Sequence, residues 1–350
     1  MKEKINFLIK DFGIPRLIIL SFLVVLLFLA LILGMDVRRL ISDSLVRVGR
    51  NALLVLALLP PIKAGIGLNF GLPVGIICGL VGLVLGLEYN LIGFYYLIFS
   101  FIIGGILAFL AGHLYGTLLN KVKGQEMMVG NYVGFAIVSL MCSFWLLAPF
   151  KNPSLIWAIG GSGLRYTLVL PSETSQLLDR FLSFSIMGIK IPTGTFLIFF
   201  LLCLLTSFFF KTRIGIAIST IGSNPIFGKA SGMNIDKLRR FSIILSTILG
   251  SFGIIVYAQS FGFVQLYTAP LMMAFPAIAC ILIGGATLRK ANIMNVVVGT
   301  FLFQSLLTIT LPVITQVVAI SGEAGDITEV LRVIISNGMI LYALTRRGGD

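Results

Sequence analysis

The segment from residue 91 to residue 120 reads LIGFYYLIFSFIIGGILAFLAGHLYGTLLN and contains no aspartate, glutamate, lysine or arginine. A helix of about 20 apolar residues is long enough to cross the hydrocarbon core of a bilayer, and this segment exceeds that length. Residues 91–120 therefore predict a membrane-spanning helix, and with it a membrane protein.

The composition of the whole chain agrees with this prediction. The 350 residues are 58% hydrophobic and only 11% charged, whereas soluble domains average about 25% charged residues. Such a chain is a poor fit to a secreted enzyme, a DNA-binding protein or a disulfide scaffold. The net charge of +13 is better explained by membrane topology than by nucleic-acid binding. Cys78, Cys142, Cys203 and Cys280 lie in separate apolar runs, which predicts small buried side chains and neither a disulfide nor a metal site.

Similar apolar runs lie on both sides of residues 91–120. Together they predict an all-α polytopic membrane protein with about ten transmembrane helices in a single domain, residues 1–350. The predicted spans are Leu17–Met35, Asn51–Leu68, Phe70–Leu87, Leu91–Asn120, Glu126–Leu147, Thr193–Phe210, Phe241–Ala258, Leu271–Leu288, Ile293–Thr315 and Ile327–Thr345. An even number of spans places both termini on one side, and most basic residues between spans fall on that side. The positive-inside rule then predicts cytoplasmic termini.

Three segments between the spans carry further expectations. Residues 36–50 place apolar side chains on one helical face, with arginines largely opposite, which predicts an amphipathic helix at the outer interface with its arginines near headgroup phosphates. An inverted N-terminal half would also explain these arginines. Residues 149–192 predict an outer, periplasmic loop with short interfacial or re-entrant pieces, and residues 211–240 predict a basic cytoplasmic loop.

Residues 60–73, PPIKAGIGLNFGLP, hold three prolines and three glycines and cannot form one regular helix. Irregular backbone at membrane depth must be buried or line a wet cavity, and transporters build solute sites at such breaks. We therefore expect a broken helix near the membrane midplane, although an ordinary short turn between two helices is the alternative. The residues expected to shape the break are Gly65, Gly67, Gly71 and Pro73. The residues expected to line the solute pathway are Asn69, Phe70, Asn131 and Gln304.

The loop at residues 211–240 contains Gly222-Ser223-Asn224 and, after seven further residues, Gly232-Met233-Asn234. Asn224-Pro225 is suited to a helix start and Gly232 to a helix stop. Downstream, the apolar run 279–287 ends in Gly-Gly-Ala-Thr, and residues 67–71 upstream read GLNFG. In this order the motifs resemble those of the permease subunits of ABC importers for ribose and other simple sugars. That family also includes nucleoside importers and related branched systems, and the resemblance covers residue 51 to the C-terminus.

The resemblance implies that the loop forms a short coupling helix that docks into an ATP-binding subunit. The coupling residues would be Gly222, Asn224, Pro225, Phe227, Gly232, Met233 and Asn234. It further implies that this chain binds no cofactor, since ATP and Mg²⁺ belong to the partner ATPase. The other implied partners are a second permease, an extracytoplasmic solute-binding protein and lipid of a bacterial inner membrane, with no nucleic acid. Pro225-Ile226-Phe227 replaces the acid and two alanines usual in the family, which would suit one half of a heterodimer.

The sequence also indicates where the energy for transport comes from. No Walker A motif is present, because Gly228-Lys229 is followed by Ala230 and Ser223 stands where the first glycine would be; the chain is therefore expected to be a transport subunit and not an enzyme. The solute is expected to be polar and neutral, a sugar or nucleoside, since few charges line the predicted path. The alternative is an ion- or proton-coupled secondary transporter, which needs titratable groups within the membrane. The candidates for that role are Lys63, Glu88, His113 and Glu126.

Overall fold

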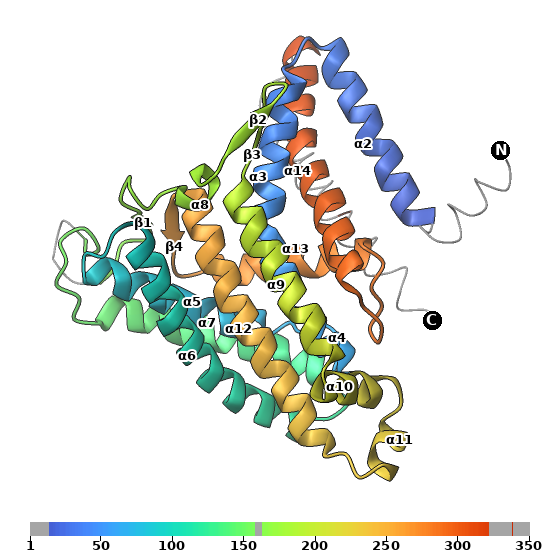
Figure 1. The fold of residues 1–350 in the computed structure, drawn as a ribbon. Coiled ribbons are helices and arrows are strands. Elements are labelled where there is room, and N and C mark those ends of the chain that lie inside the picture. Colours follow the sequence, from blue (N-terminus) through green and yellow to red (C-terminus); the bar gives the residue numbers. More distant parts are fainter. Residues whose placement is uncertain (1–13, 158–162, 322–337, 339–350) are drawn as a thin grey trace, which may run out of the picture.

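The computed structural model describes residues 14–157, 163–321 and 338, and the fold is mostly helical (Figure 1). The helices are α2 (Ile14–Ile32), α3 (Val37–Leu56), α4 (Leu59–Lys63), α5 (Leu72–Glu88), α6 (Gly93–Lys121), α7 (Glu126–Leu147), α8 (Leu177–Arg180), α9 (Thr193–Lys211), α10 (Arg213–Ser223), α11 (Pro225–Ala230), α12 (Ile235–Phe261), α13 (Ala269–Ile283) and α14 (Ile293–Ser321). The short strands are β1 (Thr167–Val169), β2 (Phe184–Ile186), β3 (Ile189–Ile191) and β4 (Phe263–Gln265).

Five helices of the described residues are long and apolar enough to cross a membrane, namely α6, α7, α9, α12 and α14. Shorter apolar helices cover Arg16–Ile32, Leu72–Glu88 and Ala269–Ile283. These findings agree with a helical membrane protein, and helix α7 has the bounds that the sequence predicts. The predicted span Ile327–Thr345 lies outside the described residues, so the number of ten spans stays a prediction.

Helix α3 differs from expectation, because one helix runs through residues 36–50 and into the predicted second span. Asp36 caps its start by accepting hydrogen bonds from the backbone amides of Arg38 and Arg39, at 3.1 and 3.3 Å, and neither proline nor a turn interrupts it before Leu56. Its apolar face packs on α12 and α14. We therefore correct the predicted boundary at residue 50: the segment is the first part of a packed helix and does not form a separate one.

Helix α12 forms the centre of the fold, with α3, α5 and α6 packed around it. Small residues allow the closest approach, as expected where helices associate by backbone contact. A Cβ atom added at Gly79 of α5 would lie 2.5 Å from the carbonyl oxygen of Ser251 and 2.3 Å from Ile254 Cγ2. At Gly105 of α6 the nearest atom would be 3.4 Å away, on the ring of Phe252.

The connecting segments gather at two opposite ends of the helices (Figure 1). The segment 149–192 contributes β1, α8 and the antiparallel β2–β3 hairpin, and β1 pairs antiparallel with β4 beyond the end of α12. Helices α10 and α11 lie at the other end of α9 and α12 (Figure 1). Residues 149–192 and 211–240 are thus separated by the length of these helices, as segments on opposite membrane faces would be.

The packing of α5 on α12 predicts a difference between two glycine substitutions. Gly79→Ala should destabilise the protein by about 1–3 kcal/mol, because its new methyl group meets a backbone carbonyl that cannot move aside alone. Gly105→Ala should leave stability unchanged or raise it slightly, since alanine favours helix over glycine. Thermal unfolding of the two purified variants in detergent measures this, and equal melting temperatures would contradict the packing described.

Candidate functional site

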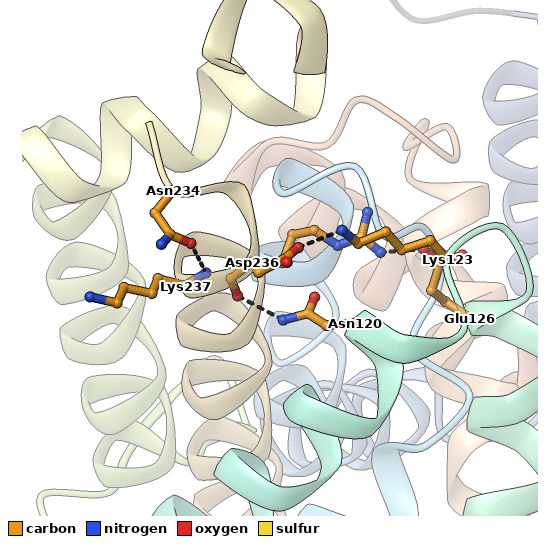
Figure 2. Close-up of polar contacts among 7 residues, drawn as sticks. Asn120, Lys123, Glu126, Asn234, Asp236 and Lys237 are labelled. Carbon is orange, nitrogen blue, oxygen red and sulfur yellow. Dashed lines mark hydrogen bonds and ion pairs between the residues drawn. The ribbon is translucent and has the colours of Figure 1, made fainter. Parts of the chain in front are cut away.

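The segment 222–234 is built by caps that its sequence supplies. Asn224 precedes α11 and accepts a 3.0 Å hydrogen bond at Oδ1 from the amide of Phe227, while Pro225 occupies the first helical position. Gly232 has a φ of +74°, a left-handed conformation that glycine adopts freely. Asn234 then caps α12 by accepting from the amide of Lys237 at 3.0 Å (Figure 2). The predicted helix start at Asn224-Pro225 and stop at Gly232 are confirmed.

Helix α11 presents an apolar edge to its surroundings. Ile226 is 82% exposed and Phe227 is 55% exposed, whereas Gly228 is buried against Ile221 of α10. Met233, after the helix, is half-buried. Large apolar side chains held outward on a capped helix are suited to a groove on a partner protein.

The start of α12 is held to the loop between α6 and α7 by polar contacts. Figure 2 shows Asp236 in an ion pair with Lys123, at 2.6 Å, while Asn120 Nδ2 donates to the Asp236 carbonyl oxygen at 2.7 Å. Glu126 and Arg239 form a second ion pair, and their side chains are only 10% and 12% exposed. A buried pair of this kind costs several kcal/mol to break, since one charge is left without its partner. These contacts fix the end of the segment 222–234 that leads into α12.

The other end of the segment, the last turn of α10, rests on the main chain next to α4. A Cβ atom at Gly222 would lie 2.0 Å from the carbonyl oxygen of Lys63, and one at Gly65 would lie 2.9 Å from the Cα of Gly222. The structure thus brings together two sets of residues that the sequence predicts separately, those expected to shape a helix break and those expected to couple to an ATPase.

The chain is non-helical between α4, which ends at Lys63, and α5, which begins at Leu72. Gly65 and Gly67 have φ values of +71° and +94° in this segment. Gly71 precedes α5, and Pro73 is in its first turn, where a missing amide hydrogen costs nothing.

Asn69 lies inside this non-helical segment and is only 3% exposed. Its Oδ1 accepts from the Gly71 amide at 3.0 Å and from the Tyr115 hydroxyl at 2.9 Å. Its Nδ2 donates to Ser246 Oγ at 3.0 Å, and that hydroxyl donates to the carbonyl oxygen of Ala57 at 2.6 Å. The side chain of Asn69 therefore bonds the protein itself and joins the break to α3, α6 and α12.

A pocket of about 470 Å³ lies at the end of α12 that is far from α11. Its walls come from α3, α12, β4, α13 and α14, and they mix aromatic, polar and basic side chains. The lining residues are Arg47, Arg50, Asn51, Tyr166, Tyr257, Phe261, Gln265, Thr268, Ala269, Met272, Met273, Pro276, Gln304 and Leu307.

Of the four residues predicted to line a solute pathway, Gln304 lines this pocket. Its Oε1 accepts from Arg47 Nε at 3.2 Å. Asn69 is buried in the break, Phe70 packs edge-on against Phe275 at 5.9 Å between ring centroids, and Asn131 is half-buried on α7. The structure does not bring these three to the pocket, and their contact with solute stays a prediction.

Sequence reasoning missed the two arginines of this pocket by placing them at the lipid headgroups. Arg50 lies over the ring of Phe261, 4.4 Å from its centroid, and its Nε donates to Ser260 Oγ at 3.4 Å. A signal was present, since Arg47, Arg50 and Asn51 fall on one face of a helix at i, i+3 and i+4.

Asp179 of α8 connects the 149–192 segment to the wall of the pocket. Thr195 of α9 and Ser260 of α12 both donate to its carboxylate. Burial raises the pKa of Asp179, and the hydrogen bonds from Ser260 and Thr195 and the nearby charge of Arg50 offset that effect only in part. The carboxylate thus joins three helices beside Arg50.

The raised pKa of Asp179 predicts a pH-dependent contribution to stability. The folded-state pKa lies above the unfolded value of about 3.9, so this contribution is full below the unfolded pKa and is lost as pH rises through the folded pKa. Relative to Asp179→Asn, the unmodified protein should therefore gain melting temperature as pH falls from about 7 to about 4. Glu173→Gln, at an exposed carboxyl on the same segment, is the control. A difference that is independent of pH would contradict the effect.

The groups considered for ion coupling lie at separate places among the described residues. Glu126 is paired with Arg239, and Glu88 accepts from the amides of Lys151 and Asn152 at 2.8 and 3.2 Å. His113 is exposed on α6. Lys63 Nζ lies over the ring of Phe210, 4.5 Å from its centroid.

Comparison with protein families matches residues 11–344 to the family described as branched-chain amino acid transport system, permease component. No curated protein and no solved structure matches the chain. The match covers nearly the whole chain and confirms the family that the sequence motifs indicate. The chain therefore belongs to this family of ABC transporter permeases and is a transport subunit.

Proposed function

We propose that this protein is the transmembrane permease subunit of an ATP-driven importer in a bacterial inner membrane. In this proposal it pairs with a second permease, identical or paralogous, and receives its solute from an extracytoplasmic binding protein. The observation that carries the proposal is helix α11, which is capped at Asn224 and holds Ile226 and Phe227 outward. Burial of these apolar side chains in a groove on a partner protein is more favourable than their exposure to water.

ATP and Mg²⁺ would be held by the partner ATPase, which would close on binding nucleotide and displace α11. A ligand that favours one of two arrangements shifts the population toward it. The pocket beside Arg50 would then exchange access between the two sides of the membrane as helices move relative to one another. The placement of the pocket and α11 at opposite ends of α12 supports this division of roles. With α11 in the cytoplasm, the pocket would lie toward the outer side. The proposal that both termini are cytoplasmic rests on the even number of spans that the sequence predicts.

A sugar or a nucleoside is the solute class we propose, on the basis of the family resemblance. The pocket supplies amide and hydroxyl groups beside aromatic rings, which suits a ring with several hydrogen-bonding groups. The expectation of a neutral solute rested on a path with few charges. Arg47 and Arg50 line this pocket, so neutrality now rests on the resemblance alone.

An ion- or proton-coupled transporter is the alternative proposal. It needs carboxylates that gain and lose protons along the path. Glu126 is paired with Arg239, and the pocket lining in the described part of the chain contains no carboxylate. These observations favour an external source of energy.

Docking through α11 predicts that Ile226→Asp releases the ATPase. A charge on a side chain that enters an apolar groove should weaken the complex by at least about tenfold, equivalent to about 1.4 kcal/mol. Co-purification of the ATPase with the permease, followed by quantification of the two subunits, measures this. Met187→Asp is a matched control, because Met187 is also 82% exposed but lies between β2 and β3 at the opposite end. Full retention of the ATPase by Ile226→Asp would refute docking through α11.

The source of energy is tested separately in proteoliposomes that contain the permease without ATPase. We expect no accumulation of radiolabelled ribose or uridine when a proton or sodium gradient is imposed, since the groups considered for ion coupling lie at separate places among the described residues. Adding the ATPase, the binding protein and ATP should start uptake of whichever probe the binding protein accepts. Accumulation of either probe by a gradient alone would support the secondary transporter instead.

A further inference from the structure

The last turn of α10 contacts residues 63–65 through main-chain atoms at Gly222, with no side chain in between. Gly222 is the reason, because a Cβ there would meet the Lys63 carbonyl oxygen at 2.0 Å and the Gly65 amide nitrogen at 2.9 Å. Main-chain contact transmits displacement directly, since no rotamer change can absorb it. Any shift of α10 along this direction must therefore move the chain at residues 63–65.

Apolar packing surrounds this contact and makes it part of a larger unit. Ala64 and Ile66 of the non-helical segment share a buried cluster with Ile218 of α10, and Tyr115 of α6 and Ile243 of α12 belong to the same cluster. Lys63 also covers the ring of Phe210 at the end of α9. Helix α10 thus rests on the non-helical segment over several side chains as well as at Gly222.

The opposite side of the non-helical segment is tied to the core by Asn69. Its hydrogen bonds reach Gly71, Tyr115 and Ser246, and Ser246 in turn bonds the carbonyl oxygen of Ala57 at the end of α3. Helix α3 carries Arg47 and Arg50 of the pocket. A continuous series of contacts therefore leads from α10 through residues 63–71 to the helix that forms one wall of the pocket.

The two flanks of α11 differ in what holds them. After α11, the start of α12 is fixed by the ion pair of Asp236 with Lys123 (Figure 2) and by the ion pair of Arg239 with Glu126. Before α11, α10 rests on a segment that lies outside the helices α4 and α5 and has two glycines at positive φ. Such a segment changes conformation more easily than a helix does. Force applied at α11 would therefore move residues 63–71 before it moves α12.

We infer that residues 63–71 are the element through which a movement of the segment 222–234 reaches the pocket, with Gly222 and Asn69 as positioning residues. The inference rests on the proposed function, since it needs an ATPase at α11. It gives the non-helical segment a mechanical role in place of the solute contact that the sequence suggests for Asn69.

A cysteine reporter in the pocket tests this inference without knowledge of the solute. Met272→Cys lies on an exposed part of the lining, and Cys142, half-buried, is replaced by serine to remove background labelling. The permease–ATPase complex in nanodiscs is labelled with a maleimide, with no nucleotide and after trapping with ATP and vanadate. Trapping should change the labelling rate by about threefold or more, as expected when a population shifts between two states.

Introducing Gly222→Ala should reduce this response to within about 1.5-fold. Gly105→Ala, the matched control on α6, should respond like the unmodified complex. Ser246→Ala adds no volume and removes the hydroxyl that links Asn69 to the carbonyl oxygen of Ala57 at the end of α3. It should lower the response while the ATPase still co-purifies and hydrolyses ATP, even if Gly222→Ala fails to fold. A full response in both Gly222→Ala and Ser246→Ala would overturn the inference. If the unmodified complex binds no ATPase, the proposed function fails, and this inference fails with it.

Discussion

Backbone amides and carbonyls that are shielded from water need hydrogen-bond partners, and this constraint is most demanding where a helix stops. Residues 64–71 illustrate this constraint, because the chain leaves the helical conformation there between α4 and α5, while the amides of Ala64, Gly65 and Ile66 still bond carbonyl oxygens of α4. The side chain of Asn69 accepts hydrogen bonds from the backbone amide of Gly71 and from the hydroxyl of Tyr115. Ser246 donates a hydrogen bond to the backbone carbonyl of Ala57. These hydrogen bonds therefore connect the non-helical segment to neighbouring helices and give it a defined conformation.

The two ends of the helices carry two different kinds of contact. At one end, α11 is exposed and capped, and its flanks rest on the Lys63 carbonyl and on the loop that holds Lys123. At the other end, Asp179 holds α8, α9 and α12 beside Arg50. Helix α12 runs between them as the most surrounded helix of the fold, so both ends share one core. A movement at either end must pass through that core or around it by way of residues 63–71.

The sequence predicts the helical membrane character well, because apolar length is a local property that each segment carries by itself. It also predicts the start of α11 at Asn224 and its stop at Gly232, since caps depend on neighbouring residues only. It does not predict that Gly222 and Gly65 touch, because that contact depends on how α10 returns to α4. It does not predict the hydrogen bonds of Asn69 either, because its partners Tyr115 and Ser246 are far away in the sequence.

Arg47 and Arg50 show how a topology rule can hide a site. The positive-inside rule counts basic residues by segment and takes each as solvated at an interface. A guanidinium can equally be held inside a fold when aromatic rings and hydrogen-bond acceptors replace water, as Phe261, Ser260 and Gln304 do here. The arginines that fall on the predicted outer side, against the positive-inside rule, then have a physical explanation. A polar pocket in an apolar chain needs charged and polar side chains to line it. Basic residues on the outer side of a permease are therefore best examined first as candidate pocket residues, and only afterwards as evidence about orientation.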